Sequence, residues 1–500
     1  MADQSYGAGE ARIREQSYGG PFSRSSQRVA NNLGIIEGTQ IGKAKKFRKP
    51  ELELFDAYYE GRQYAGLSPW YAPQGSEDNY IPIRMRQPLI KYDFPKTICD
   101  RVAAKIVGYS MFPNFKVEDE PETEALLKEI IKQSKLKSKI MEPMRRMLAA
   151  GSSFLRFSLV EGQLKLEHYL SKYCYPKFDS LGHLESIRIQ YIYDDEEDRN
   201  AKGDPKKKWY RLDLEKMRDV LYDNPEFSAN ADPQFSIVAV ADHGLGFVQG
   251  EWFRTAVLKH CPDGPSLFEG SLCFFDELNY SLSQSSQAIM YNQDPQMTIT
   301  GVDEDELEKL IKSSMKAWNL GKEGKAEFLE SNLGAVERAI EFRDKIRLAM
   351  QDVSRVVLLD PEKMIGQAQS GKAMEILHGP MVELIDEMRP ELEDRLISIV
   401  LKMYATIIHA TAQGIETSFD LTGYQVPENL NVGIQWNEIF PKTLEDLQKK
   451  ISIANSASSA QIISRDTAMR WVAKDFGIED IEAELEKIAA QPVLNPFGGF

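Results

Sequence analysis

The chain has 500 residues, of which 42% are apolar, so it is long enough to form about three compact units. Its formal net charge is −15, from 61 Lys and Arg against 76 Asp and Glu. This charge argues against tight non-specific binding of phosphates, which needs clustered cations. There is no apolar run of roughly 18 residues and the amino terminus is polar, so we expect neither a membrane span nor a secretion signal.

The cysteines and the amino-terminal segment carry little chemistry. The four cysteines are scattered and form no CxxC pair, so neither a zinc site nor a disulfide framework is indicated, and a reducing compartment is favoured. Residues 1–48 are rich in Gly, Ser, Gln and Arg, with little periodicity. We interpret them as an arm, which is either a mobile tail or a segment that embraces a neighbouring subunit or a surrounding shell.

Helices are predicted first along the chain, followed by strands. A helix over 52–59 ends near Gly61, and a Pro- and Tyr-rich loop follows to Pro88. A second helix over 94–107 turns Ile98, Val102 and Ile106 inward, and helical patterning returns over 122–147. From Ser152 the apolar period changes to two, which predicts antiparallel strands over 154–159, 164–166 and 187–193.

Two local patterns resemble binding motifs. The acids of 194–198 followed by Lys206, Lys207 and Lys208 resemble a metal cluster, but we interpret them as a solvated hairpin tip. Gly244, Gly246 and Gly250 miss the dinucleotide fingerprint by one residue of spacing, so the region 232–250 is predicted to consist of short strands and turns.

The central stretch 266–413 contains three predicted helices. The first covers 267–292 and stops before Pro295. The second covers 334–353, with an apolar stripe of Phe342, Ile346, Met350 and Val353 and with charged residues at the remaining positions.

The third predicted helix starts after Gly371 and runs towards Ala412, about 60 Å long, and Pro380 and Pro390 are expected to kink it. The loop before it, 359–371, is expected to be irregular and to act as a hinge. Beyond it, 431–436 alternates like a strand, and 440–490 is predicted to be helical, with Thr443 and Ser464 as N-caps.

A phosphate-binding loop must be considered, because 366–373 fits GxxxxGK. The residue after Lys372 is Ala373, which has no oxygen to hold magnesium, so a nucleotide-hydrolysing DNA motor is the weaker alternative. The six histidines show no HxH or HExxH spacing and no GxSxG occurs. The sequence therefore indicates no catalytic, cofactor or metal residues, and we predict that the chain is not an enzyme.

Short motifs in a fixed order resemble the portal proteins of tailed bacteriophages, particularly those of long-tailed phages. Tyr58, Tyr59 and Gly61 match a "YY.G" opening, and Gln369 to Met374 resembles the start of that family's long kinked helix, which accounts for the false phosphate loop. Two further matches are a "D..N...S" pattern from Asp276 through Asn279 to Ser283, and segments near Pro441 and Ser464. The resemblance covers about 50–490. The apolar run over 356–364 departs from it, because it is richer than a polar tunnel loop would be.

The resemblance implies a mainly α, α+β portal fold with wing, stem, clip and crown, a long kinked helix and a tunnel loop. The implied divisions are these: arm 1–48, wing 49–265, first stem helix 266–292, clip 293–333, second stem helix 334–354, tunnel loop 355–371, kinked helix and wing strand 372–439, and crown and tail 440–500. It also implies a homo-oligomeric ring, normally of twelve subunits, at one capsid vertex of the virion, assembled in the host cytoplasm.

In such a ring double-stranded DNA would pass through the channel, and the partners would be the major capsid protein, the terminase large subunit and a head-tail adaptor. Another ring of the head-tail connector is a further alternative, but such proteins are usually much shorter. The residues then expected at the DNA channel are Glu337, Glu341, Asp344, Lys345 and Asp352 of the second stem helix and Lys363, Gln367 and Gln369 of the tunnel loop. Those expected at the clip docking site are Asp303, Glu304, Asp305, Glu306 and Glu308, although simple capping of a helix start also explains these acids.

Overall fold

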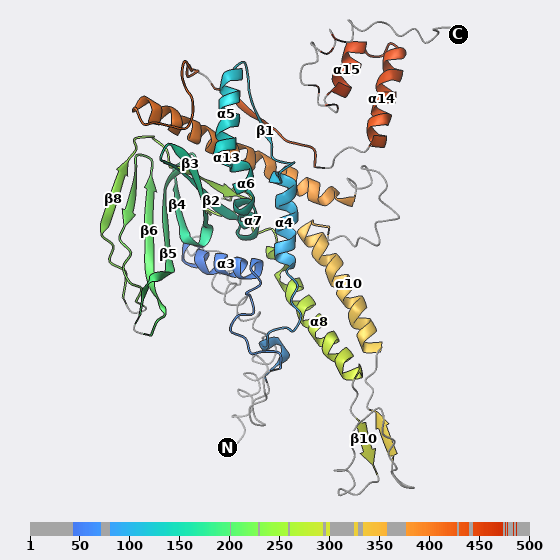
Figure 1. The fold of residues 1–500 in the computed structure, drawn as a ribbon. Helices are drawn as coiled ribbons and strands as arrows, with labels where there is room; N and C mark the ends of the chain where they lie inside the picture. The colour runs from blue at the N-terminus through green and yellow to red at the C-terminus, as the bar shows by residue number, and fades with distance from the viewer. Residues whose placement is uncertain are drawn as a thin grey trace, which may run out of the picture. The chain divides into compact units, whose positions relative to one another are not determined.

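A computed structural model of the chain describes 44–71, 81–200, 202–228, 231–258, 261–293, 297–300, 325–328, 334–357, 377–427, 430–439 and 444–473, together with four isolated residues near the carboxyl end. The chain divides into two compact units. One contains 1–356 and 384–437, and the other contains 357–383 and 438–500. Both helices and antiparallel strands are present, which confirms the α+β class (Figure 1).

The larger unit is built around a short central helix, α7 (Met141–Ala150), which packs against α3 (Ala44–Tyr59) and α4 (Phe94–Val107). The bounds predicted for α4 are confirmed, and Ile98, Val102 and Ile106 are fully buried. Helix α3 begins earlier than expected, inside the segment assigned to the arm. Its Arg48 explains why, because the Arg48 guanidinium binds Asp263 and the carbonyl oxygens of Ser171 and Cys174.

The helical stretch predicted over 122–147 is broken into three pieces. Helix α5 (Pro121–Gln133) is followed by the single turn α6 (Leu136–Lys139) and then by α7. Lys135 lies at the first break with a φ of 58°, a left-handed conformation that ends a helix. The periodicity of apolar residues continues across this break, which is why the sequence suggested one longer helix.

A three-stranded antiparallel sheet covers α7. Its order is β3 (Gln163–Leu170), β2 (Ser152–Val160), β9 (Gly250–Arg254). Gly151 joins α7 to β2 with a φ of 82°, and a Cβ atom there would lie 1.9 Å from the Gly264 carbonyl oxygen. Only glycine fits this crossing of two backbone segments.

A five-stranded antiparallel meander follows, in the order β4 (Cys174–Phe178), β5 (Leu184–Arg199), β6 (Pro205–Glu215), β7 (Arg218–Tyr222) and β8 (Ile237–Asp242). The acids of 194–198 lie near the end of β5, where Asp194 and Asp195 are opposite Lys207 and Lys206 and the register shifts over 196–198. The Lys208 ammonium lies 2.8 Å from the Asp195 carboxylate and 3.0 Å from that of Asp198. The acid-rich segment therefore lies at the largely exposed end of the β5–β6 hairpin, in agreement with the predicted solvated hairpin tip, and lysines of β6 neutralise part of its charge.

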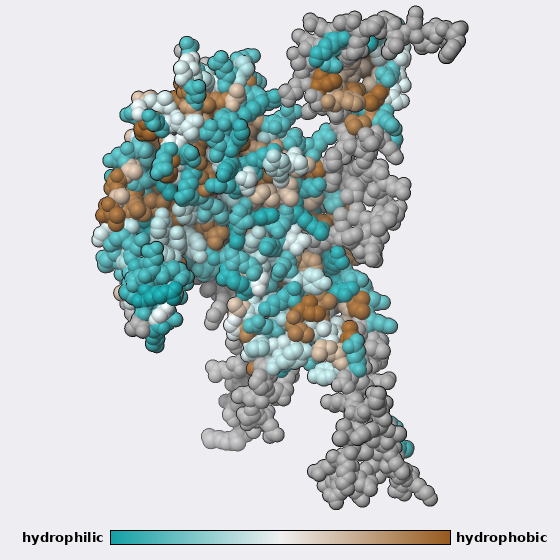
Figure 2. All heavy atoms as spheres, viewed as in Figure 1, coloured by the Kyte–Doolittle hydropathy of each residue, from teal (hydrophilic) through white to brown (hydrophobic). Residues whose placement is uncertain are grey.

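Strand β8 forms one edge of this sheet, and all six of its residues are exposed. Ile237 and Val238 expose more than 60% of their surface, and Asp242 is the only charged residue of the strand. Figure 2 shows hydrophobic side chains at this margin of the sheet. Edge strands usually carry charges or proline to discourage pairing with other chains, and β8 has little of this protection.

Two long helices, α8 and α10, form a pair in the larger unit. Helix α8 (Leu272–Gln293) follows the short 3-10 turns η4 (Glu269–Ser271), and helix α10 (Gly334–Ser354) packs against it. The bounds predicted for α10 are confirmed, whereas α8 begins five residues later than predicted, after η4. Between the two helices, β10 (Met297–Thr300) pairs with β11 (Lys325–Phe328) in antiparallel register.

Helix α13 (Gly379–Ala412) is the long third helix. Its apolar positions, including Ile385, Leu392 and Leu396, are fully buried. The helix continues through Pro390 as one element, and the kink expected there stays a prediction. Pro380 lies in its first turn, where a missing amide donor costs nothing, so no kink is needed there. Among the described residues, α13 is the one helix whose length and composition would suffice to cross a membrane, and 44% of its most apolar window is buried inside the protein.

Short strands join distant parts of the larger unit. The strand predicted over 431–436 is β12 (Val432–Gln435), and it pairs antiparallel with β1 (Asn114–Val117). A 3-10 turn, η2 (Ile83–Met85), lies in the loop before α4, and η3 (Ser171–Tyr173) separates β3 from β4.

The smaller unit contains α14 (Leu444–Ser459) and α15 (Arg465–Ala473), which pack on each other. The Ser464 hydroxyl accepts a hydrogen bond from the Thr467 amide at 3.1 Å, so the predicted N-cap is confirmed. Thr443, the other predicted cap, lies outside the described residues.

Candidate functional site

The antiparallel pair of α8 and α10 forms the candidate site. Gly270, just before α8, lies beside Val353 at the end of α10, so the two helices run in opposite directions. Among the α10 side chains that the structure describes, the buried large apolar ones are Ile346 and Met350, one helical turn apart. They define the face of α10 that is covered, and Figure 2 shows hydrophobic surface remaining on this helix pair.

The outer face of α10 is opposite to that covered face. The charged residues predicted for a DNA channel are all exposed there: Glu337, Glu341, Asp344, Lys345 and Asp352. Asp344 forms an ion pair with Arg343 at 3.0 Å. Their common exposure follows from the helical period, and their role at a channel stays a prediction.

The apolar stripe predicted for α10 is wrong at its two ends. Phe342 and Val353 each expose half of their side-chain surface, whereas Ile346 and Met350 are buried. A helix of 3.6 residues per turn places Phe342 and Val353 about 40° to 60° away from the middle of the buried face, on a flank that is only half covered. The described residues of one chain therefore leave about half of these two side chains exposed.

Other predicted site residues cannot be placed. The tunnel-loop candidates Lys363, Gln367 and Gln369 lie outside the described residues, as do the clip candidates Asp303, Glu304, Asp305, Glu306 and Glu308. Lys372 of the GxxxxGK pattern also lies outside them.

The face of α8 turned towards the loop before α4 is polar and buried. The Asp276 carboxylate accepts hydrogen bonds from the hydroxyls of Tyr58, at 3.0 Å, and Tyr64, at 2.6 Å. The Asn279 side chain donates to the Tyr64 hydroxyl at 3.0 Å and accepts from the Tyr92 amide at 2.9 Å. We call Tyr58, Tyr64, Asp276 and Asn279 the α8 junction, because they join α8 to α3 and to the loop.

Burial dominates the electrostatics of the α8 junction. It raises the pKa of Asp276 to about 6, although the two tyrosine hydroxyls favour the charged form and Arg84 adds a smaller effect in the same direction. Arg84 forms an ion pair with Glu277 and lies over the Tyr280 ring, 5.1 Å from its centroid. The Asp276 carboxyl therefore changes charge close to neutral pH while it links two segments of the chain.

Further bonds extend this attachment along α8. The Ser283 hydroxyl accepts from the Ile90 amide at 3.0 Å, and the Gln287 carbonyl oxygen accepts from the Trp70 indole at 3.1 Å. The Tyr280 hydroxyl donates to the Arg86 carbonyl oxygen at 2.8 Å. One side of α8 is thus fixed by hydrogen bonds over about three turns.

The sequence did not predict the α8 junction, although it contained an indication of it. Asp276, Asn279 and Ser283 recur at three- and four-residue steps, so one face of α8 had to be polar. Tyr58 belongs to the tyrosine pair that matched the opening motif, and its hydroxyl binds Asp276 of the second motif. Two motifs separated by more than two hundred residues are therefore one contact in the fold.

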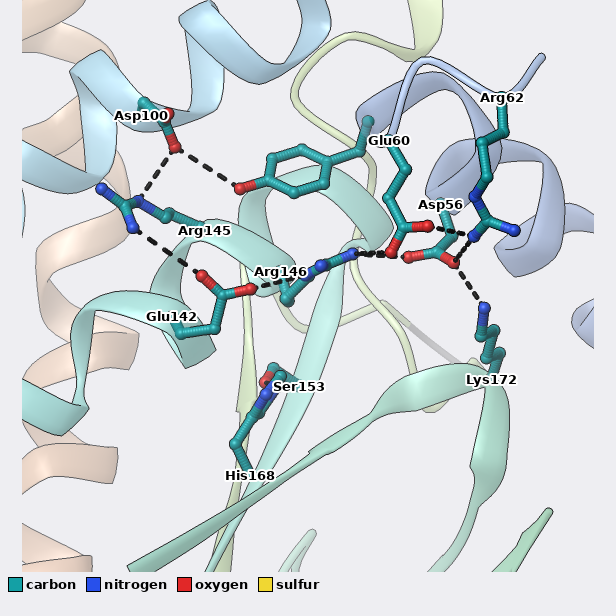
Figure 3. Close-up of polar contacts among 11 residues, drawn as sticks. Asp56, Glu60, Arg62, Asp100, Glu142, Arg145, Arg146, Ser153, His168 and Lys172 are labelled. Atoms are coloured by element: carbon teal, nitrogen blue, oxygen red, sulfur yellow. Dashed lines mark hydrogen bonds and ion pairs between the residues drawn. The ribbon is translucent and has the colours of Figure 1, made fainter. Parts of the chain in front are cut away.

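A second polar cluster holds α3 against α7 and η3, as Figure 3 shows. Asp56 is buried and accepts from the Arg146 guanidinium at 2.8 Å and from the Lys172 ammonium. Arg146 also pairs with Glu60 at 3.0 Å and with Glu142 at 2.8 Å. Each of these charges has an opposite charge beside it, so the cluster stabilises the packing of helices.

The same view contains a serine beside a histidine. The Ser153 hydroxyl lies 2.9 Å from Nε2 of His168. Ser153 is fully buried, and burial lowers the pKa of His168 to about 4, so its imidazole is neutral. A buried hydroxyl offers no access to a substrate, and this pair serves the strand packing of β2 and β3. Within the described part of the chain, no group of three or more His, Cys, Asp or Glu side chains is suited to hold a metal ion.

Helix α13 is fixed to the edge strand β9 by a buried carboxylate. Glu251 accepts from the Lys402 ammonium at 2.6 Å, from the Ser398 hydroxyl at 2.7 Å and from the Arg395 guanidinium at 3.0 Å. Burial alone would raise the pKa of Glu251, but Lys402 and Arg395 outweigh it and lower that pKa. A hollow of about 460 Å³ beside this cluster is lined mainly by apolar atoms of Phe247, Asp394, Ile397, Ser398, Leu401, Lys402 and Ala405.

Comparison with known proteins gives a weak structural similarity only. No protein-family model and no curated protein matches the chain. The neck of a native GTA particle computed with C12 symmetry is similar over 77% of this chain and 95% of its own, at 10% identity and a TM-score of 0.40. The neck of an empty GTA particle computed with C6 symmetry is similar over 76% and 88%, at 10% identity and a TM-score of 0.41. Similarity at this level is too low to establish a common fold or function.

Proposed function

We propose that this chain is a portal protein of a tailed, phage-like particle. Copies of it form a ring, normally of twelve, at one vertex of the capsid, and double-stranded DNA enters and leaves through the centre. The ring is also the docking platform for the terminase large subunit and for a head-tail adaptor, and it is surrounded by the major capsid protein.

The helix pair α8 and α10 is the observation that carries this proposal. The two helices are antiparallel, the segment between them contains the paired strands β10 and β11, and α10 keeps one charged face exposed. This is the order of stem, clip and stem that the sequence resemblance implies. Long helices with one uncovered side supply the head-to-tail contacts that a ring needs.

The charges of α10 suit a surface past which DNA must slide. Glu337, Glu341, Asp344 and Asp352 repel phosphates, whereas Lys345 attracts them only locally. Repulsion between such charges acts over about 8 Å at physiological salt. DNA would therefore be centred in the channel and held weakly.

Further contacts rest on the sequence alone. Lys363, Gln367 and Gln369 of the tunnel loop are proposed to touch the DNA backbone, and the acids of 303–308 are proposed to dock the terminase or the adaptor. The chain itself is proposed to perform no chemistry, because the energy for packaging comes from the separate terminase ATPase. Replacing Lys372 with alanine separates the alternatives, because a nucleotide-hydrolysing motor would lose nucleotide binding, whereas a portal would show only an assembly defect or no change.

Negative-stain electron microscopy of the purified full chain tests the proposal. Top views are expected to show rings with a central hole, and counting the subunits in them gives the symmetry. A monomeric chain that binds ATP would overturn the proposal and return attention to 366–372.

A further inference from the structure

The outer face of α10 has two edges of opposite charge. Each residue advances a helix by about 100°, and Asp352 lies near the middle of this face. Lys345 and Arg338 lie roughly 20° and 40° to one side of it, and Glu337 and Asp344 lie roughly 60° and 80° to the other. All five side chains are exposed. We call the side of Arg338 and Lys345 the basic edge and the side of Glu337 and Asp344 the acidic edge.

Each edge also carries uncovered apolar side chains. Phe342 and Val353 are half exposed beyond the basic edge, while Leu348 and Ile340 are 60% and 41% exposed on the acidic side. Large apolar residues that remain exposed along one helix mark a contact surface. They extend over the same length of α10 as the charges.

The heights of the charges along α10 match. Arg338 follows Glu337 directly, and Lys345 follows Asp344 directly, so each cation lies within about 1.5 Å of an acid along the helix axis. Rotation about a ring axis places identical residues of neighbouring copies at the same height. The basic edge of one copy then meets the acidic edge of the next copy at two levels.

We propose that α10 of one copy packs beside α10 of the next at the margins of the channel-facing surface, with Arg338 and Lys345 of one copy facing Glu337 and Asp344 of the other. Glu341 and Asp352, between these margins, then face the DNA most directly. The occupant of this surface is therefore a second copy of the same chain, and the inference rests on the proposed ring. In this contact Asp344 pairs with a cation of the neighbouring copy, either in place of Arg343 of its own chain or in addition to it. The contact joins two different surfaces, the basic edge of one copy and the acidic edge of the next, because two basic edges or two acidic edges repel each other. A contact of this kind can close into a ring.

Two double variants of the full chain test this contact. R338E/K345E makes both edges acidic, and E337K/D344K makes both edges basic. Each variant alone is expected to form rings at least about tenfold less abundantly than the wild type at equal concentration, because like charges meet at every contact. An equal mixture is expected to restore rings in which the two variants alternate. Size-exclusion chromatography with light scattering, followed by electron microscopy, measures the ring fraction.

Controls separate this contact from other causes. E341Q/D352N changes the middle of the same face and is expected to assemble like the wild type. Thermal unfolding of every variant shows whether it is folded. If a double variant is not folded, the single variants Lys345→Glu and Asp344→Lys are mixed in its place. If both charge-changed variants form normal rings, or if both are folded but their mixture forms no rings, the contact between the two edges is wrong. The proposed ring itself would still stand, because the wild type forms it. Absence of rings in the wild type would overturn both.

Discussion

The inner face of α8 and the outer face of α10 belong to one helix pair, yet they differ in where their partners are. On α8, Asp276 and Asn279 are buried and bind tyrosines and backbone of the same chain. On α10, the predicted channel charges are exposed, as are four of the six large apolar side chains whose burial the structure describes. Helix α8 therefore attaches the pair to the rest of the larger unit, whereas the outer face of α10 is exposed among the described residues and can make contacts outside the chain.

Truncating a core residue of α8 should have the largest effect on stability. Phe275 is fully buried and packs against Phe268, with ring centroids 6.0 Å apart. Phe275→Ala is expected to lower the free energy of unfolding by about 4 kcal/mol, because it removes buried surface and leaves a cavity. Phe342→Ala on α10 is the matched control, since half of that ring is already exposed. Urea unfolding measures both, and equal losses would abolish the contrast between the helices.

The pH dependence of stability should reveal the buried carboxyl of the α8 junction. The pKa of Asp276 is raised to about 6 from 3.8, so the folded state holds this proton more tightly than the unfolded state. The contribution of Asp276 to the free energy of unfolding is therefore greatest below about pH 4. It falls by roughly 3 kcal/mol as the pH rises from there through about 6.

Asp276→Asn is expected to remove this part of the pH profile, because its side chain does not ionise. Denaturant unfolding between pH 4 and 8 measures the difference between the variant and the wild type. A difference that does not change with pH would show that Asp276 ionises as it does in water.

Loss of the Asn279 side chain should have a smaller effect. Asn279→Ala leaves the Tyr92 amide without its acceptor and removes a bond to the Tyr64 hydroxyl. The expected loss is about 2 kcal/mol, the cost of leaving a partly buried donor unsatisfied. Gln284→Ala, at an exposed position of the same helix, is the control, and a similar loss there would point to helix propensity instead.

The outer face of α10 should contribute least to the stability of a single chain. Leu348 exposes 60% of its surface, so Leu348→Ala is expected to change the free energy of unfolding by no more than about 0.5 kcal/mol. The measurement is made at a concentration where the chain is monomeric. A loss above about 2 kcal/mol would mean that this face is covered within the chain.

Local periodicity explains what could be predicted. The bounds of α4 and α10 followed from apolar residues at helical spacing, and β2, β3 and β5 followed from alternation. The exposure of the charged positions of α10 has the same origin. Phe342 and Val353 were misjudged because their stripe is only partly covered in one chain.

Contacts between distant segments could not be predicted in this way. The pairing of β1 with β12 and the bond between Tyr58 and Asp276 join residues that are hundreds of positions apart, and no local pattern specifies such partners. The break at Lys135 depends on one backbone conformation, which apolar periodicity does not record.

The exposed edge of β8 has a consequence for the isolated protein. Its unpaired backbone groups and its uncovered Ile237 and Val238 offer a template for strand addition by any other chain with a similar edge. Solubility of the free chain is therefore expected to be limited by self-association along this strand rather than by net charge.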